Sequence, residues 1–166
     1  MKNESDLPLV EIKEYINVGM GGLHKNEIPI ATNGILTCMG IGTHIGGINY
    51  FSHATPIDYS GASGKYSLIY KWQKLLKDNI DKINLIYLYS PYGVSEDSLP
   101  FLEILNNLEL IDKTRHVNTI IINNETNDFT NEWNGEFKVG ISKDGPWGYD
   151  YSVKKKYIFT EEEECE

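Results

Sequence analysis

The chain has few cysteines and no long apolar run. Only two cysteines, Cys38 and Cys165, occur in 166 residues, which excludes a disulfide framework and favours a reducing, cytosol-like working environment. No run of about 18 apolar residues exists, which excludes a membrane-spanning helix. The opening residues MKNESDLPLVEIKEY lack the apolar core of a secretory signal peptide. We therefore expect a soluble protein that is cytoplasmic or exported by a route independent of such a signal.

Positive charge is also scarce, with 15 Lys+Arg against 24 Asp+Glu and a net charge of −9. Nucleic-acid binding needs a basic surplus to neutralise phosphates, so we expect no nucleic-acid partner. Residues 161–166 carry five of the acids. We predict one domain over residues 1–160 and a solvated, mobile acidic tail over 161–166. The lysine run at residues 154–156 predicts a strand at a sheet edge, because lysines discourage edge pairing.

Sequence motifs for metals and nucleotides are missing. The sequence has no CxxC or HExxH, and its four histidines lack ligand spacing, so we expect no metal site. The glycines of residues 40–42 resemble the start of a dinucleotide loop, but the next glycine comes one residue late and a strand-like run follows. Gly64 and Lys65 resemble the end of a phosphate-binding loop, but Tyr66 replaces the magnesium-binding Ser or Thr. We expect no cofactor.

Hydrophobic periodicity predicts alternating strands and helices. Apolar runs bounded by glycine, at residues 35–42 and 46–53, predict neighbouring strands joined by a tight turn. Helical spacing predicts a helix that starts near Ser63 and a second helix within residues 95–110. The apolar residues on the two helix faces are Leu68, Trp72, Leu75, Leu76, and Phe101, Leu102, Leu105, Leu108. Residues 82–90 and 117–125 read as buried strands.

The last third predicts a hairpin. Residues 137–142 read as a strand, Asp144 to Gly148 as a turn, and residues 149–159 as a strand with alternating inward side chains. The inward residues are Tyr151, Val153, Lys155 and Tyr157. The whole order predicts an α/β (α+β) domain, a β-sandwich or twisted mixed sheet flanked by two helices.

Cys38 and His53 carry the clearest chemical pattern. A thiolate is a strong nucleophile, and an imidazole beside it can accept the thiol proton and later return it to a leaving amine. In the predicted strand pair, Cys38 and His53 face each other. Thr32 enters the same sheet region, so that its hydroxyl or carbonyl orients the His53 ring. The structural alternatives, a core cysteine and a hydrogen-bonded histidine, stay open.

These residues also carry a family resemblance. Residues 32–38, TNGILTC, followed by Gly46, Gly47 and His53, resemble the protein glutamine deamidases, which include the chemoreceptor deamidase CheD, the catalytic domain of cytotoxic necrotizing factor and Burkholderia lethal factor. The resemblance covers about 25 residues closely, and the Cys-to-His gap of 15 lies within the family's range. Leu36 departs from the small residue at this position in the family, whereas Thr37 is compatible with the Ser that precedes the nucleophile in CheD.

The resemblance implies a deamidase-like β-sandwich and a hydrolase. Cys38, His53 and Thr32 would be catalytic, and the chain would convert a glutamine of a target protein to glutamate through a thioester. It further implies a bacterial toxin or effector, a virulence factor that acts in the reducing cytosol of a target cell. Three alternatives stay open: a cysteine protease or amidase, a transglutaminase with the same dyad, and a non-catalytic protein-binding module. The sequence leaves the oligomeric state open.

Four further residues are weighed as accessories. Asp58 follows the His53 strand and is a candidate substrate-binding residue or a turn residue. Trp147, expected at a turn tip, is a candidate substrate contact or a core residue. Strand alternation predicts that His44 points to the opposite face from His53, with a structural or exposed role. Cys165 is expected to be incidental.

Overall fold

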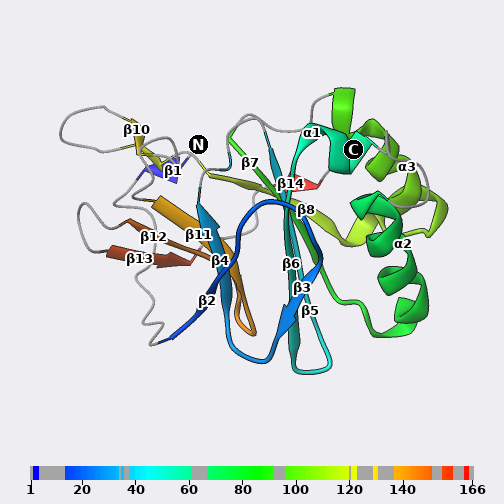
Figure 1. The fold of residues 1–166 in the computed structure, drawn as a ribbon, viewed down its shortest axis with the longest axis horizontal. Coiled ribbons are helices and arrows are strands. Elements are labelled where there is room, and N and C mark those ends of the chain that lie inside the picture. Colours follow the sequence, from blue (N-terminus) through cyan, green and yellow to red (C-terminus); the bar gives the residue numbers. More distant parts are fainter. Residues whose placement is uncertain are drawn as a thin grey trace.

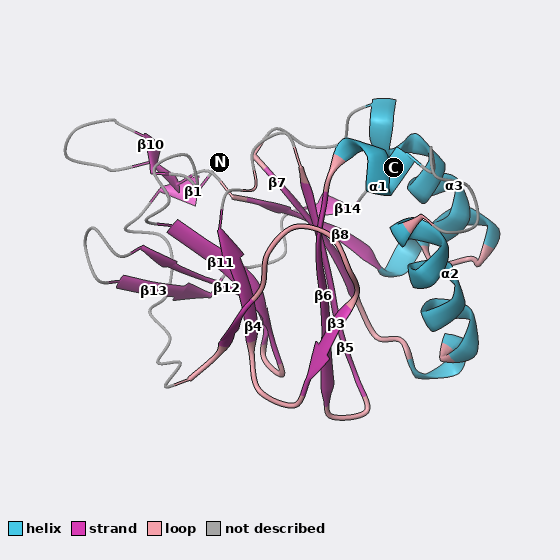
Figure 2. Ribbon diagram, in the orientation of Figure 1, coloured by secondary structure: helices cyan, strands magenta, loops and turns pink. Residues whose placement is uncertain are grey.

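The structure is a computed structural model. It describes residues 2–3, 14–33, 35, 38–60, 67–91, 96–119, 121–122, 129–130, 137–150, 155–158 and 163–164. Two larger β-sheets face each other, and helices cover the outer face of one of them (Figures 1 and 2). This arrangement confirms the mixed α/β class and the flanking helices. None of the helices in the described residues is long and apolar enough to cross a membrane.

The strands form three sheets. The five-stranded sheet has the order β13-β12-β11-β4-β2, with β2 Ile16–Asn17, β4 Ile30–Asn33, β11 Phe137–Ser142, β12 Gly145–Asp150 and β13 Lys155–Ile158. The six-stranded sheet has the order β14-β8-β7-β5-β6-β3, with β3 His24–Asn26, β5 Met39–Ile45, β6 Ile48–Ala54, β7 Ile86–Ser90, β8 Thr114–Asn118 and β14 Glu163–Glu164. A small sheet joins β1 Lys2–Asn3, β9 Ile121–Ile122 and β10 Phe129–Thr130.

The helices are short. The α-helices are α1 Pro56–Ser60, α2 Leu68–Asp78 and α3 Leu99–Asn107, and the 3-10 turns are η3 Ile80–Lys82, η4 Glu96–Ser98 and η5 Ile111–Lys113. α1 was not expected from the sequence. The predicted helix start at Ser63 lies outside the described residues, and α2 begins at Leu68.

The β5–β6 hairpin supplies two neighbouring interior strands of the six-stranded sheet. Gly46 and Gly47 form its two-residue turn with φ of 56° and 84°, the positive values that a type I′ turn requires and glycine adopts without strain. The antiparallel register runs from Ile45 opposite Ile48 to Met39 opposite Ala54. The predicted tight hairpin is confirmed, but β5 begins at Met39, so Cys38 lies just before the strand instead of within it.

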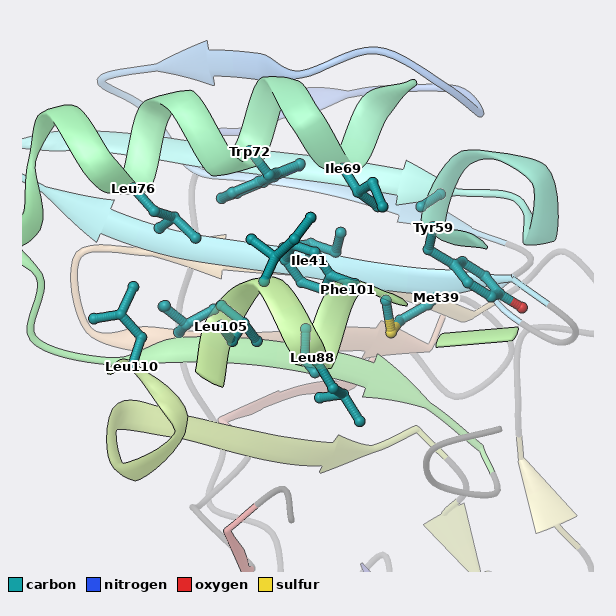
Figure 3. Close-up of a cluster of buried hydrophobic side chains, with 14 of the residues drawn as sticks. Met39, Ile41, Tyr59, Ile69, Trp72, Leu76, Leu88, Phe101, Leu105 and Leu110 are labelled. Atoms are coloured by element: carbon teal, nitrogen blue, oxygen red, sulfur yellow. The ribbon is translucent and has the colours of Figure 1, made fainter. Parts of the chain in front are cut away.

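One core lies between the six-stranded sheet and the helices. Figure 3 shows Trp72 and Leu76 of α2 and Phe101 of α3 gathered around Ile41 of β5, and all four side chains are fully buried. The Trp72 indole N–H donates a hydrogen bond to Ser52 Oγ at 2.8 Å. Of the predicted helix faces, Leu75 and Leu108 are only partly buried, at the margin of this core.

A second core fills the space between the two larger sheets. Phe51 of β6 and Tyr89 of β7 pack edge to face, with ring centroids 5.3 Å apart, against Ile30 and Val139 of the opposite sheet. The Tyr89 hydroxyl donates to the Gly140 carbonyl at 2.8 Å, which ties the sheets together. The space between the two sheets is therefore a packed core, in which one face of β6 contacts β4 and β11.

The C-terminal part corrects two expectations. The turn of the β11–β12 hairpin is at residues 143–144, and Trp147 lies within β12 instead of at the turn tip. Glu163 and Glu164 pair with β8, so these two tail residues extend the sheet, against the prediction of a wholly mobile tail. The predicted lysine edge is confirmed, because Lys155 and Lys156 lie on the edge strand β13. Tyr151, Val153, Lys154 and Cys165 lie outside the described residues.

Candidate active site

His53 points from β6 into the space between the two larger sheets. Side chains alternate along β6, and Phe51, which belongs to the core between the sheets, shares its face with His53. The His53 side chain is buried, with 3% of the residue exposed. A buried imidazole needs partners for both ring nitrogens, or a reason for lacking one.

Thr32 supplies the first partner from the opposite sheet, whereas the sequence placed it in the same sheet region as His53. Its Oγ1 lies 2.9 Å from His53 Nδ1 and donates its own proton to the Val18 carbonyl at 2.8 Å. Because the hydroxyl has a single proton, Oγ1 accepts from Nδ1–H. The chain from His53 through Thr32 to Val18 therefore fixes the neutral ring with its proton on Nδ1.

The second ring nitrogen is left as a base. His53 Nε2 is buried and has no hydrogen-bond partner in the part of the chain that the structure describes. With the proton held on Nδ1, Nε2 carries a lone pair that can accept a proton. A buried, oriented and unpartnered acceptor is the state required of a general base before substrate binds.

Cys38 directly precedes β5, the strand that pairs with the His53 strand β6. Gly40 is directly opposite His53, and the register ends with Met39 opposite Ala54. Cys38 keeps its thiol and is half-buried. The sequence expected a directly facing pair; the register instead places Gly40 opposite His53, and Cys38 lies two residues before that glycine, just outside β5.

Gly40 has a packing reason to lack a side chain. A Cβ there would lie 2.8 Å from both Ile35 Cδ1 and Tyr89 Cβ, closer than carbon atoms pack. A larger residue would therefore push against the core between the sheets, on the same face that His53 occupies.

A strap of residues 18–22 joins the two sheets beside His53. Figure 1 shows this dark blue segment arching from β2 to β3 across the open edge of the sandwich. Val18 N–H donates to the Ala31 carbonyl at 2.8 Å, and Gly21 N–H donates to the His53 carbonyl at 2.8 Å. Met20 forms a bridge with His53 and is 68% exposed. Sequence reasoning missed this strap; the run Gly19-Met20-Gly21-Gly22 was its signal.

Burial and one carboxylate act on His53 in opposite directions. Loss of water around the ring lowers the pKa of His53 from its ordinary value of 6.5, and the negative charge of Asp58 raises it in part. The burial effect is the larger one, so the neutral imidazole is favoured at neutral pH.

Asp58 has a local structural role. Thr55 donates to Asp58 Oδ2 from its backbone N–H and its hydroxyl, both at 2.9 Å, and Asp58 N–H donates back to Thr55 Oγ1 at 3.4 Å. This reciprocal pair is a capping box at the start of α1. The structure thus accounts for Asp58 by capping and by its charge near His53, while a contact with substrate stays a prediction.

Trp147 and His44 correct two further expectations. Trp147 is 1% exposed and packs edge to face on Tyr15, with ring centroids 5.4 Å apart. Its burial favours the core alternative over a substrate contact.

His44 is opposite Asn49 in the register, and Asn49 lies on the same face of β6 as His53. His44 therefore lies on the same face as His53, whereas alternation in the sequence predicted the opposite face. The structural role of His44 is confirmed by its hydrogen bond to Asn49 at 2.7 Å.

A scan against models of known protein families and a search of curated proteins gave no match. The described residues hold no group of three or more His, Cys, Asp or Glu that could bind a metal ion. The candidate site offers a thiol, an oriented imidazole and a threonine hydroxyl.

Proposed function

We propose that the chain is a protein glutamine deamidase with Cys38 as nucleophile, His53 as general base and acid, and Thr32 as the residue that orients His53. The observation that carries this proposal is the hydrogen bond from His53 Nδ1 to Thr32 Oγ1, which leaves the buried Nε2 as an acceptor with no partner among the described residues. A structural histidine would be expected to satisfy both nitrogens.

The first half of the reaction forms a thioester. His53 Nε2 takes the proton of the Cys38 thiol, and the sulfur attacks the side-chain carbonyl carbon of the glutamine. The carbon–nitrogen bond then breaks, and the proton on Nε2 passes to the leaving nitrogen, which departs as ammonia. The resulting imidazole is neutral again, with Nδ1–H still held by Thr32.

The second half hydrolyses the thioester. Nε2 takes a proton from water, and the hydroxide oxygen attacks the same carbon. The carbon–sulfur bond breaks, the thiolate recovers the proton, and glutamate is released. Backbone N–H groups next to Cys38 would hold the oxyanion in both halves; Gly34, Leu36 and Thr37 lie outside the described residues.

The class of substrate follows from the resemblance of residues 32–53 to the deamidases. A neutral amide becomes an anion, which can inactivate or lock a target protein. We propose that the partner is a protein that carries the modified glutamine, and that the chain acts as a bacterial toxin or effector delivered to a reducing cytosol, where the Cys38 thiol stays reduced.

The test is the rate of iodoacetamide alkylation across pH, read on intact protein by mass spectrometry. We expect Cys38 to react faster than Cys165 below neutral pH and to lose that lead in His53→Ala. His44→Ala, on the same hairpin and face, is the matched control and should keep the lead. A Cys38 that is inert, or indifferent to His53, would contradict catalysis and favour a binding module.

A second measurement identifies the reaction. Incubating a proteome with wild-type protein should add about one dalton to a glutamine-containing peptide without chain cleavage, because NH₂ is replaced by OH. Cys38→Ser should abolish this change. Cleavage of the polypeptide would indicate a protease, and incorporation of an added amine would indicate a transglutaminase.

A further inference from the structure

A cavity of about 200 Å³ opens at the end of the sandwich opposite to Cys38. His44, which lines it, precedes the Gly46–Gly47 turn, whereas Cys38 precedes the first residue of β5. Six residues of extended chain separate the two, or roughly 20 Å at about 3.3 Å per residue. The cavity is therefore distinct from the candidate active site.

His44 is oriented there by the same device that orients His53. Its Nδ1 lies 2.7 Å from Asn49 Oδ1. Asn49 is 1% exposed, and its Nδ2 donates to the Ile28 carbonyl at 3.0 Å and the Glu27 carbonyl at 3.4 Å. Because the amide nitrogen faces two carbonyls, its oxygen faces His44 and must accept. The neutral His44 ring thus carries its proton on Nδ1, and its Nε2 is an acceptor on a residue that lines the cavity.

One basic and one acidic residue line the cavity from the five-stranded sheet, opposite to the sheet that carries His44. Lys143 and Asp144 form the turn between β11 and β12. This turn is held in shape, because Asp144 N–H donates to Ser142 Oγ at 3.2 Å and Ser142 Oγ donates to the Gly145 carbonyl at 3.1 Å. One basic and one acidic residue, both exposed, therefore line the cavity from a braced turn, and His44 lines it from β5.

The inner wall is apolar. Leu85, Tyr87 and Ile141 line it, and Ile141 and Tyr87 belong to the core between the sheets. The complement of this cavity is a small molecule with an ammonium for Asp144 and His44 Nε2, a carboxylate for Lys143, and an aliphatic body for the inner wall.

We propose that this cavity binds a free α-amino acid with an aliphatic side chain. Other ligand classes fit less well. A lone anion would be repelled by Asp144, and a divalent cation would lack ligands, since no group of three acidic, His or Cys residues occurs in the described part of the chain. A volume of about 200 Å³ is also below the usual range for nucleotide-sized ligands.

The test is calorimetric titration of the full chain with L-leucine and with two analogues. Isocaproic acid lacks the ammonium group of leucine, and isoamylamine lacks its carboxylate. We expect a Kd of about 1 mM for L-leucine, given its few atoms, and at least about tenfold weaker binding of both analogues, since each loses a charge-assisted hydrogen bond. No binding of L-leucine, or equal binding of the analogues, would overturn the proposal.

Variants and spectra locate the site. Lys143→Met and Asp144→Asn should each weaken L-leucine binding about tenfold, whereas the exposed controls Lys71→Met and Asp81→Asn should not change it. In imidazole ¹⁵N spectra, L-leucine should shift the Nε2 resonance of His44 and leave that of His53 unchanged. A shift at His53 alone would place the ligand in the candidate active site and overturn the proposal. The wild-type titration decides the question if a variant fails to fold.

Discussion

His53 Nδ1 and Thr32 Oγ1 lie 2.9 Å apart and join the two sheets of the sandwich. His53 belongs to β6 of the six-stranded sheet and Thr32 to β4 of the five-stranded sheet. The contact couples the proton position on the ring to the packing of the sheets, since the Val18 carbonyl fixes the Thr32 hydroxyl from the strap.

Thr32→Val should therefore separate the effect of the hydroxyl group from the effect of the side-chain volume. The substitution keeps the β-branched volume but leaves the buried Nδ1–H without its acceptor, which costs about 1–3 kcal/mol of folding free energy. We expect the rate of Cys38 alkylation below neutral pH to fall about 10- to 100-fold, as general-base assistance is impaired. Thr32→Ser, which keeps the hydroxyl, should retain most of the rate. Equal rates for both variants would show that the hydroxyl does not orient His53.

Gly40→Ala should destabilise the fold. The new Cβ would meet Ile35 and Tyr89 at 2.8 Å, and overpacking of this kind costs about 1–3 kcal/mol. Urea unfolding measures the loss. Gly19→Ala is the matched control, because a Cβ at Gly19 has nothing within 4 Å; its unfolding midpoint should stay close to that of the wild type. An unchanged unfolding midpoint for Gly40→Ala would mean that the contact between β5 and β7 adjusts to the new Cβ at little cost in free energy.

The buried His53 should make stability depend on pH. Its pKa is lowered in the folded state, so the unfolded chain binds more protons as the pH falls below about 6.5. Stability contributed by the neutral ring is thus present above that value and is lost as the pH falls through the window between the unfolded and folded pKa. Comparing urea unfolding at about pH 7.5 and 5.5, we expect His53→Gln to lose less stability than wild type. An equal loss of stability in the two proteins would indicate that the His53 ring is exposed to water in the folded state.

Asp58→Asn should lower the pKa of His53 further. The carboxylate of Asp58 is the charge that raises this pKa against the effect of burial, and the amide removes it while it can still accept from Thr55. NMR titration of the imidazole resonances measures the change. Asp81→Asn, on the exposed turn η3, controls for the general loss of one negative charge. A pKa that rises in Asp58→Asn would contradict the assigned cause.

Local pattern was sufficient for the elements that contain the site. The glycine pair at residues 46–47 requires a turn with positive φ, and the apolar runs on either side supply two strands, so the β5–β6 hairpin follows from the sequence. Helical periodicity likewise predicts the buried face of α2, from Leu68 to Leu76. These patterns work because turn geometry and side-chain periodicity act over a few residues.

Exposure was harder to predict where packing decides it. Trp147 reads as a turn residue because Gly and Pro surround it, yet it lies in β12 against Tyr15. Glu163 and Glu164 read as a solvated tail, yet their backbone pairs with β8. In both cases the partner comes from a distant part of the chain, and composition cannot reveal it.

The sequence by itself determined the candidate residues Cys38, His53 and Thr32, from the chemistry that each type can perform and from their resemblance to the deamidases. Only the tertiary structure decided that Thr32 reaches His53 from the opposite sheet, that a Val18 carbonyl fixes its hydroxyl, and that Gly40 stands opposite the ring. The physical reason is that strand alternation fixes which face a side chain occupies, but not which sheet packs against that face. A backbone carbonyl, moreover, has no side-chain signature, so its role appears only when the chain is folded.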